Sequence, residues 1–410
     1  MTLPHQGSLW QLPSFSRFLT ARVIGILSNQ MLMLAIAWHV YDLTSSAWDL
    51  GLVGLFQFIP ALIMTLPAGH LADRVHRGHI FAVCLLVQMG VAASLLMATY
   101  DQFATREMMF ALSVVLGMTR AFQMPAQQAI TPLLVPTELL QSAVAVSSGG
   151  MQAAIIAGPA LGGVLYAISP LWVYGACVSL TFLAALQTWR VTIPHHIKAD
   201  AASWSSVLAG VVFVWQRKLL LGAMSLDLFA VLLGGATALL PIYARDILHI
   251  GPQGLGLLRS APAVGALLMS LWLARHPMER HVGQRLLWAI GVFGLATLVF
   301  GVSRNVVISW LALVITGAAD NISVVIRLTL MQLETPDEMR GRVAAVNTVF
   351  IGASNQLGEF ESGATAALLG AVGSVILGGA GTIAVAWLWM KWFPTLAQRD
   401  RMTKDEATDR

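Results

Sequence analysis

Apolar runs of about 20 residues recur along the whole chain, separated by short groups of glycine, proline and charged residues. Each run is close to the length that a helix needs to cross about 30 Å of hydrocarbon. The pattern therefore predicts twelve membrane-spanning helices, at 17–41, 48–72, 79–100, 107–132, 141–167, 169–191, 218–245, 253–275, 284–302, 306–331, 342–369 and 371–393.

The longest polar interval, 192–217, divides these spans into two sets of six. It holds His195, His196 and Lys198, followed by WSSVLAGVVFVWQRK, which has the pattern of an amphipathic helix at a membrane interface. The predicted domains are an N-terminal six-helix bundle, a cytoplasmic linker, a C-terminal six-helix bundle and a cytoplasmic tail, at 1–191, 192–217, 218–393 and 394–410.

Composition agrees with a multi-pass membrane protein. Hydrophobic residues make up 57% of the 410 residues and charged residues 11%, with a mean hydropathy of +0.73. A soluble globular protein carries about a quarter charged residues, so a soluble enzyme is disfavoured, and disordered, collagen-like and disulfide-rich classes are excluded. The two cysteines, Cys84 and Cys177, lie inside apolar runs and predict neither a disulfide nor a redox role.

Basic residues predict the orientation, because cytoplasmic connections are enriched in Lys and Arg. With both termini cytoplasmic, 18 of the 24 basic residues fall on that side, three in outer connections and three within spans. The expected location is the cell (inner) membrane. The net charge of +4 then reflects topology, and no nucleic-acid partner is expected.

The second half repeats the first at an offset of about 200 residues. Parallel repeats of this kind, related by an axis along the membrane normal, place a shared cavity between the halves at mid-membrane. The matches at an offset of 200 are Gly117 with Gly317, Pro136 with Pro336, Glu138 with Glu338, Ala145-Val146 with Ala345-Val346, Gly158 with Gly358 and Gly163 with Gly363.

The connection after the second span reads GHLADRVHR, from Gly69 to Arg77. It resembles the signature G-x-L-a-D-r-x-G-r-r of the major facilitator superfamily, with His76 where the pattern has glycine. Asp73, beside Arg74 and Arg77, is predicted to form a charged latch between the two halves that breaks and reforms. The alternative is an ordinary positive-inside loop with a carboxylate at a helix end.

The fifth span holds Gly150 and then Gly158-Pro159-Ala-Leu-Gly162-Gly163. This resembles the antiporter motif of the same superfamily, G-x(7)-G-P-x-x-G-G, which is associated with proton-coupled exporters. The glycines allow another helix to approach closely, and the proline removes a backbone hydrogen bond and permits bending. Generic packing of small residues is the alternative interpretation.

The stretch from Ala319 to Arg342, with TPDEMRGRV near its end, resembles the enterobactin-exporter branch of that superfamily. The resemblance covers essentially the whole chain and assigns Arg340 and Arg342 to the gating motif. It implies an all-α membrane fold of twelve helices in two parallel six-helix repeats around a central cavity. It also implies a monomer that exports siderophores or drugs.

Charges at mid-membrane are costly, about 2.5–3.5 kcal/mol each on insertion scales, and are functional candidates by default. Arg120, Asp227 and Asp320 lie near the middle of the fourth, seventh and tenth spans, which line the cavity in the resembled fold. A carboxylate there changes protonation as its exposure changes, so Asp320 first and Asp227 second are predicted to couple protons. Arg120 is assigned to a counter-ion or to a substrate anion. A static interhelical network is the alternative.

Glu359 and Glu361 in the eleventh span are further candidates for proton coupling, and one of them is expected to pair with Arg259 in the eighth. Arg327 lies seven residues from Asp320, about 10.5 Å along the helix, too far for direct pairing, and is assigned to the inner mouth. Polar residues expected to line the substrate cavity are Asn29, Gln30, His39, Gln57, Gln123, Gln127 and Asn321.

The leading hypothesis is a proton-coupled secondary transporter that exports a small amphipathic molecule, drug or siderophore-like, by rocker-switch alternating access. A facilitator, an importer or a lysolipid flippase on the same fold is the alternative. No GxxxxGK[ST], H-E-x-x-H or G-x-S-x-G occurs, so no enzyme, metal site or cofactor is predicted. A sensor or scaffold would leave the midplane charges unexplained.

Overall fold

The computed structural model describes residues 9–192, 204–278 and 280–402, without the side chains of 66, 70, 72–74 and 204–207. These described residues form helices and connecting turns, with no strand. Contacts between Cα atoms group them into two compact units. Unit 1 comprises residues 1–39 and 59–202, and unit 2 comprises residues 40–58 and 203–410.

Unit 1 is built mainly from long helices, with α3 packed between α4 and α6. Phe18 of α1 lies edge-on to Phe81 of α3, and both belong to a buried cluster with Ile130 of α4 and Ala184 of α6. Its elements are η1 (Leu9–Gln11), α1 (Pro13–Thr44), α2 (Ala47–Arg74), α3 (Arg77–Tyr100), α4 (Arg106–Leu134), η2 (Thr137–Leu139), α5 (Leu140–Ile168) and α6 (Pro170–Trp189), of which the end of α1 and the start of α2 belong to unit 2.

Unit 2 pairs α8 with α13, α10 with α12, and α11 with both α12 and α13. Leu226, Ile290, Ile326 and Trp389 share one buried cluster that joins α8, α11, α12 and α13. Its elements are α7 (Trp204–Gln216), α8 (Lys218–Gly234), η3 (Ala236–Leu239), α9 (Leu240–Ile242), the π-helix η4 (Tyr243–Ile247), α10 (Gly251–Arg275), α11 (Val282–Val302), α12 (Val306–Glu334), α13 (Asp337–Trp392) and α14 (Pro394–Ala397).

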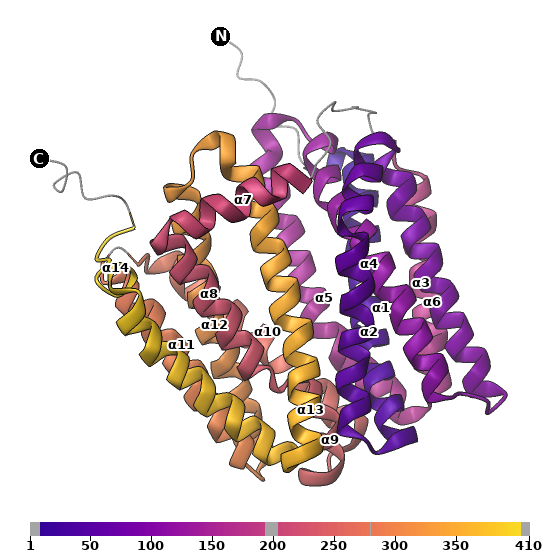
Figure 1. The fold of residues 1–410 in the computed structure, drawn as a ribbon. Helices are drawn as coiled ribbons and strands as arrows, with labels where there is room; N and C mark the ends of the chain where they lie inside the picture. Colours follow the sequence, from indigo (N-terminus) through magenta and orange to yellow (C-terminus); the bar gives the residue numbers. More distant parts are fainter. Residues whose placement is uncertain (1–8, 193–203, 279, 403–410) are drawn as a thin grey trace, which may run out of the picture. The chain divides into compact units, whose positions relative to one another are not determined.

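The long element α13 consists of two helices that run in opposite directions, and Figure 1 shows its orange first part and yellow second part meeting at a sharp turn. Gly370 makes this turn at a φ of 75°, in the left-handed region that glycine adopts without steric cost. Ser374 donates a hydrogen bond to the carbonyl of Ser362 at 3.0 Å, across the turn. The predicted break between 369 and 371 lies at this position.

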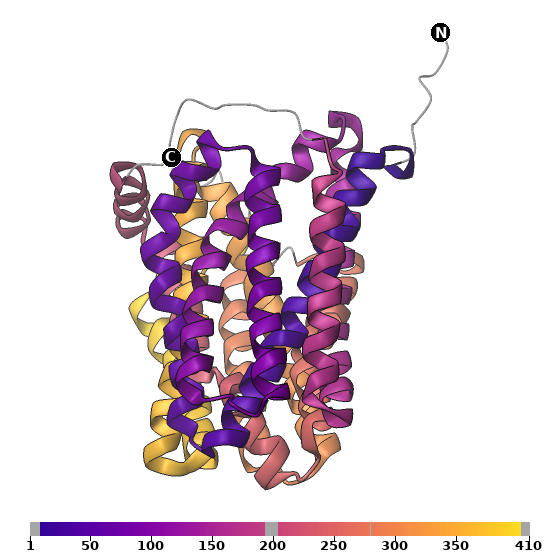
Figure 2. The same cartoon turned by 90° about the vertical axis from the view of Figure 1, so that its right-hand side faces the viewer.

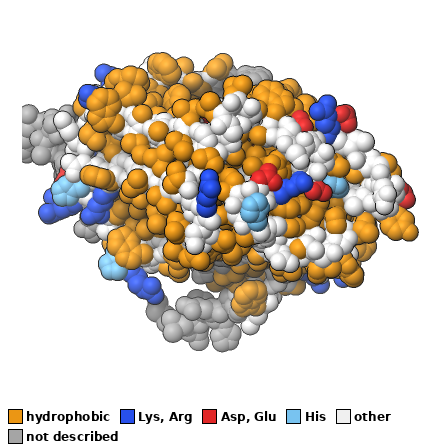
Figure 3. Space-filling model, turned by 90° about the horizontal axis from the view of Figure 1, so that it is seen from below, with side chains coloured by type: hydrophobic (Ala, Val, Ile, Leu, Met, Phe, Trp, Pro, Cys, Tyr) orange, Lys and Arg blue, Asp and Glu red, His pale blue; other side chains and the backbone are white. Residues whose placement is uncertain are grey.

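The predicted spans correspond to helices along the whole described chain. Among the described residues, ten helical stretches are long and apolar enough to cross a membrane, and one of them is α13, which consists of two helices. The predicted span 107–132 coincides with α4, and the predicted amphipathic helix with α7. Figure 3 shows one end of the molecule, where hydrophobic side chains dominate and charged side chains form a few small groups.

Contacts between Cα atoms assign one segment of the N-terminal part of the chain to unit 2. Residues 40–58, from the end of α1 into α2, pack with unit 2. The ring of Trp48 lies 5.5 Å from that of Phe360 in α13, and a Cβ placed on Gly51 would lie 3.0 Å from the Cα atom of Gly363. His195, His196 and Lys198 of the predicted linker lie outside the described residues.

Candidate functional site

A polar stripe follows one face of α12, where Asp320, Ser323 and Arg327 are separated by three and four residues. This spacing places them on the same side of a helix, over two turns. Ser323 and Arg327 are buried and Asp320 is half-buried. The stripe therefore brings three groups that can hold charge or a hydrogen bond into the interior of unit 2.

Arg327 forms a buried ion pair with Asp227 of α8. Its Nη2 lies 3.0 Å from Oδ2 of Asp227, and the two side chains are 3% and 5% exposed. Ser323 donates a hydrogen bond to Oδ1 of Asp227 at 3.1 Å, and Nη1 of Arg327 donates one to Oδ1 of Asn347 in α13 at 3.0 Å. The network ties α8, α12 and α13 together.

The sequence did not reveal this pairing. Arg327 was assigned to an inner mouth, whereas the structure buries it against Asp227, 100 positions earlier. Asn347 and Ser323 were not singled out as site residues. In the sequence, each is simply a polar residue inside an apolar helix. Serine and asparagine also occur at many positions where helices pack, so this signal does not single out a site.

Asp320 has a different environment from Asp227. It lies within electrostatic range of both Asp227 and Arg327. Among the residues that the structure describes, none donates a hydrogen bond to Asp320 or forms an ion pair with it. Because Arg327 is already engaged by Asp227, Asp320 is the carboxylate of this cluster whose charge has no bonded counter-ion.

A second group of charges lies on α10 and α13. Glu359 acts electrostatically on Arg259, the residue that was expected to pair with one of the two glutamates. The Glu359 carboxylate also reaches the bare backbone of Gly54 in α2, where a Cβ would lie 2.9 Å from Oε2. Glu361, two residues further on, is half-buried.

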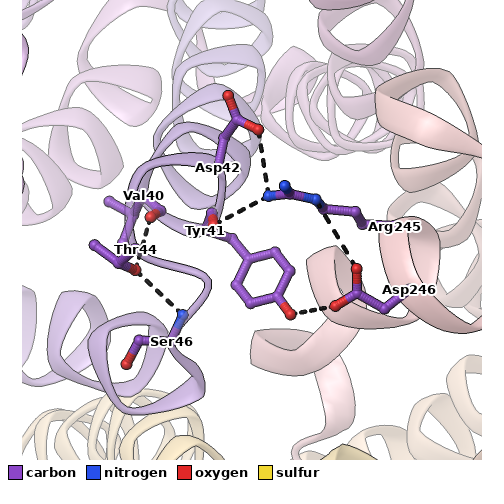
Figure 4. A network of polar contacts seen from close by, with 7 residues as sticks. All are labelled: Val40, Tyr41, Asp42, Thr44, Ser46, Arg245 and Asp246. Carbon is purple, nitrogen blue, oxygen red and sulfur yellow. Dashed lines mark hydrogen bonds and ion pairs between the residues drawn. The ribbon is translucent and has the colours of Figure 1, made fainter.

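A third network joins the end of α1 to the π-helix η4 within unit 2, and Figure 4 shows its members. Arg245 lies 3.3 Å from the carboxylate of Asp42 and donates to the carbonyl of Tyr41 at 3.3 Å. The Tyr41 hydroxyl donates to Asp246, which in turn lies 3.9 Å from Arg245. This network holds the start of the 40–58 segment on unit 2.

We expect Arg245→Gln to change the free energy of unfolding by less than about 1 kcal/mol, because exposed ion pairs gain little in water. The Arg245 side chain is 37% exposed and that of Asp42 is 56% exposed. Chemical denaturation of the purified protein in detergent measures the change. A loss of several kcal/mol would mean that this network is a main support of the fold.

The polar residues predicted to line the cavity are divided between the two units. In unit 1, Gln88 donates a hydrogen bond to Gln123 at 2.7 Å, and the buried His39 is bonded to the Tyr174 hydroxyl at 2.9 Å. In unit 2, Asn321 accepts a hydrogen bond from Ser270 at 3.1 Å. The others are Gln127, which is buried, Arg120, which is exposed, and Asn29, Gln30 and Gln57, which are half-buried.

A family model described as "Major Facilitator Superfamily" matches residues 18–359, most of the chain and parts of both units. The chain belongs to the major facilitator superfamily. The fold predicted from the sequence is thereby confirmed, and the protein is a multi-pass membrane transporter of small molecules, not an enzyme.

Relatives of this superfamily member include a protein named enterobactin exporter EntS from Citrobacter koseri, 26% identical over 386 residues, 92% of this chain and 91% of that protein. Among solved structures, a mutant of the nucleoside transporter NupG has a TM-score of 0.74 at 14% identity, covering 93% and 100% of the two chains. A bacterial homolog of the human lysosomal transporter Spinster, inward-facing and occupied, has a TM-score of 0.72 at 14% identity, covering 98% and 100%.

The two superfamily motifs occupy helix ends and a helix crossing. Gly69 lies near the end of α2 and Arg77 begins α3, while the side chains of Asp73 and Arg74 lie outside the described residues. In the second half, Arg340 pairs with Asp337 at 2.6 Å and Arg342 is exposed. The latch between these groups stays a prediction.

The glycines of the antiporter motif pack α5 against α1 inside unit 1. A Cβ on Gly150 would lie 2.8 Å from Val23, one on Gly158 would lie 2.6 Å from Gln30, and one on Gly162 would lie 3.0 Å from the Cα atom of Met31. Pro159 and Gly163 are buried in the same helix. The two helices therefore cross at backbone distance, where larger side chains do not fit.

Proposed function

We propose that this transporter exports a small amphipathic molecule of the siderophore class, driven by protons that enter the cell in exchange. The proposal places it in a bacterial inner membrane as a monomer with both termini cytoplasmic. The two halves alternate the access of one cavity, and Asp320 takes up and releases the coupled proton. No cofactor or metal takes part.

Export of a siderophore-like compound is supported by the curated relatives, which match almost the full length of the chain and are named enterobactin exporters. The name enterobactin exporter describes those proteins, and this chain is about 25% identical to them. The compound class is therefore the part of the proposal that needs measurement first.

Proton coupling is supported by the contrast between Asp320 and Asp227. The Asp227 charge is compensated by Arg327 at 3.0 Å and the carboxylate accepts a hydrogen bond from Ser323 at 3.1 Å, so protonating it would remove the ion pair. Asp320 is half-buried beside this closed pair. A proton can join Asp320 without breaking a bond to another described side chain, which is what a group that loads and unloads in each cycle requires.

The buried pair of Asp227 and Arg327 lies among helices of unit 2 and suits a contact that persists through the cycle.

The test is transport by the full chain in liposomes that contain a pH-sensitive dye. Enterobactin, other catechol siderophores and hydrophobic cations are added one at a time, and proton release triggered by each compound is recorded. We expect one of these classes to trigger release, and Asp320→Asn to reduce it to the level of protein-free liposomes.

A matched control replaces an exposed carboxylate instead. Glu107→Gln, on the first turn of α4, changes the same type of group at a side chain that is 70% exposed, and should leave the proton flux unchanged. Movement of substrate that neither needs nor dissipates a proton gradient would reject the antiport proposal and favour a facilitator or flippase. Uptake driven by the gradient would favour an importer.

A further inference from the structure

The short helix α7, Trp204–Gln216, is set apart from the spans of unit 2. Its 13 residues extend about 20 Å, which is too short for a hydrocarbon core of about 30 Å. It contacts α13 and α8. Figure 1 shows it running across the ends of the helices of unit 2, and Figure 2 shows it in rose at their edge.

One face of α7 is apolar and exposed. Leu208, Val211, Val212 and Trp215 follow the spacing of a helical stripe, and their exposed fractions are 58%, 38%, 52% and 70%. Large apolar side chains aligned in this way on a soluble surface mark a face that is covered by something else. The stripe therefore needs an apolar neighbour.

The opposite face of α7 is held against α13. Val214 is buried in one cluster with Val343 and Val346. A Cβ on Gly210 would lie 2.8 Å from the carbonyl oxygen of Arg342 and 3.0 Å from the side chain of Val346. Because α7 and α13 meet at backbone distance here, α7 cannot roll its exposed stripe inward.

Three exposed basic residues adjoin this helix. Arg217 and Lys218 follow its last turn and are exposed, as is Arg342, whose carbonyl meets Gly210. The stretch 204–218 contains no acidic residue. The nearest acidic groups in sequence to Arg342 are Glu338 and Asp337, and Asp337 is paired with Arg340 at 2.6 Å.

We propose that α7 lies in the membrane interface with its apolar stripe among the acyl chains, and that Arg217, Lys218 and Arg342 bind the headgroups of anionic phospholipids. A lipid surface fits both features at once, since an interfacial helix combines an apolar face with Lys and Arg beside it. Trp215 lies in the stripe near the end of the helix, a residue type that favours the headgroup level. The bound lipid holds α7, and through Gly210 the start of α13, at the bilayer surface.

The depth of α7 is tested with nitroxide labels on the full chain in liposomes. Single cysteines replace Leu208, Val212 and, as a polar control, Gln102 in the turn between α3 and α4, in a Cys84→Ala, Cys177→Ala background, since both native cysteines are buried. We expect labels at 208 and 212 to collide with oxygen and not with a water-soluble nickel chelate, and the label at 102 to collide with the chelate. Collision of all three with the chelate would reject the proposal. Stripe labels that neither reagent reaches would indicate a protein partner or a second copy.

The headgroup preference is tested with a fluorophore at residue 212 and brominated lipids in equal amounts. Brominated phosphatidylglycerol should quench it more strongly than brominated phosphatidylcholine, and the preference should vanish in Arg217→Gln/Lys218→Gln/Arg342→Gln. Each basic residue contributes up to about fivefold. Arg304→Gln, an exposed arginine between α11 and α12, should keep the preference. Equal quenching by both lipids in the unsubstituted protein would overturn the headgroup assignment.

Discussion

Asp227→Asn is expected to lower the free energy of unfolding by about 3–5 kcal/mol, the cost of leaving a buried charge without its partner. Arg327 would keep its charge in a position where its side chain is 3% exposed. Asn347 accepts one hydrogen bond from Nη1 of Arg327, but a neutral amide oxygen cannot neutralise the positive charge of the guanidinium. Denaturation in detergent, followed by loss of helix signal, measures the change.

The double variant Asp227→Asn/Arg327→Gln separates lost attraction from uncompensated charge. The double variant buries two neutral amides and leaves no unpaired charge. We therefore expect it to be more stable than Asp227→Asn alone. Arg245→Gln removes a charge from an exposed ion pair and is the matched control. It should lower the free energy of unfolding several times less than Asp227→Asn does. A cost below about 1 kcal/mol for Asp227→Asn would mean that water reaches the pair.

Gly317→Ala is expected to destabilise the crossing of α10 and α12 in unit 2. Its Cβ would lie 1.9 Å from the carbonyl oxygen of Pro262 in α10, and a Cβ on Gly265 would lie 1.8 Å from the carbonyl oxygen of Val314 in α12. Both clashes are with backbone, so the helices must separate. Overpacking of a core costs about 1–3 kcal/mol. The separation would also displace Asp320, one turn along α12, so transport should fall together with stability.

Gly291→Ala is the matched control for this crossing. Gly291 lies within α11, and nothing lies within 4 Å of the Cβ it would gain. Alanine there is expected to leave stability unchanged or raise it by up to about 1 kcal/mol, since alanine is the better helix former. Equal stability of Gly317→Ala and the unsubstituted protein, measured by the same unfolding assay, would show that α10 and α12 can part without loss.

The sequence alone predicted the spans to within a few residues where each helix ends at a polar or helix-breaking signal. The predicted span 79–100 became α3, Arg77–Tyr100, and 141–167 became α5, Leu140–Ile168. The break at Gly370 was also predicted. These features are local, because a membrane span must satisfy its backbone groups within its own helix and must match the thickness of the bilayer. The internal repeat identified Gly317 without showing what it contacts.

Only the tertiary structure decided which charged and polar side chains meet. The sequence marked Asp227, Asp320 and Arg327 as intramembrane charges, yet the partner of Arg327 is Asp227, with Asn347 completing the set from a third helix. Residues 40–58 pack with unit 2, although they lie in and between the first two predicted spans. Such contacts depend on how helices far apart in the chain rotate and cross, and hydropathy measures each helix separately. The sequence therefore determined the helices, and packing among them selected the ion pair that leaves Asp320 without a bonded counter-ion among the described residues.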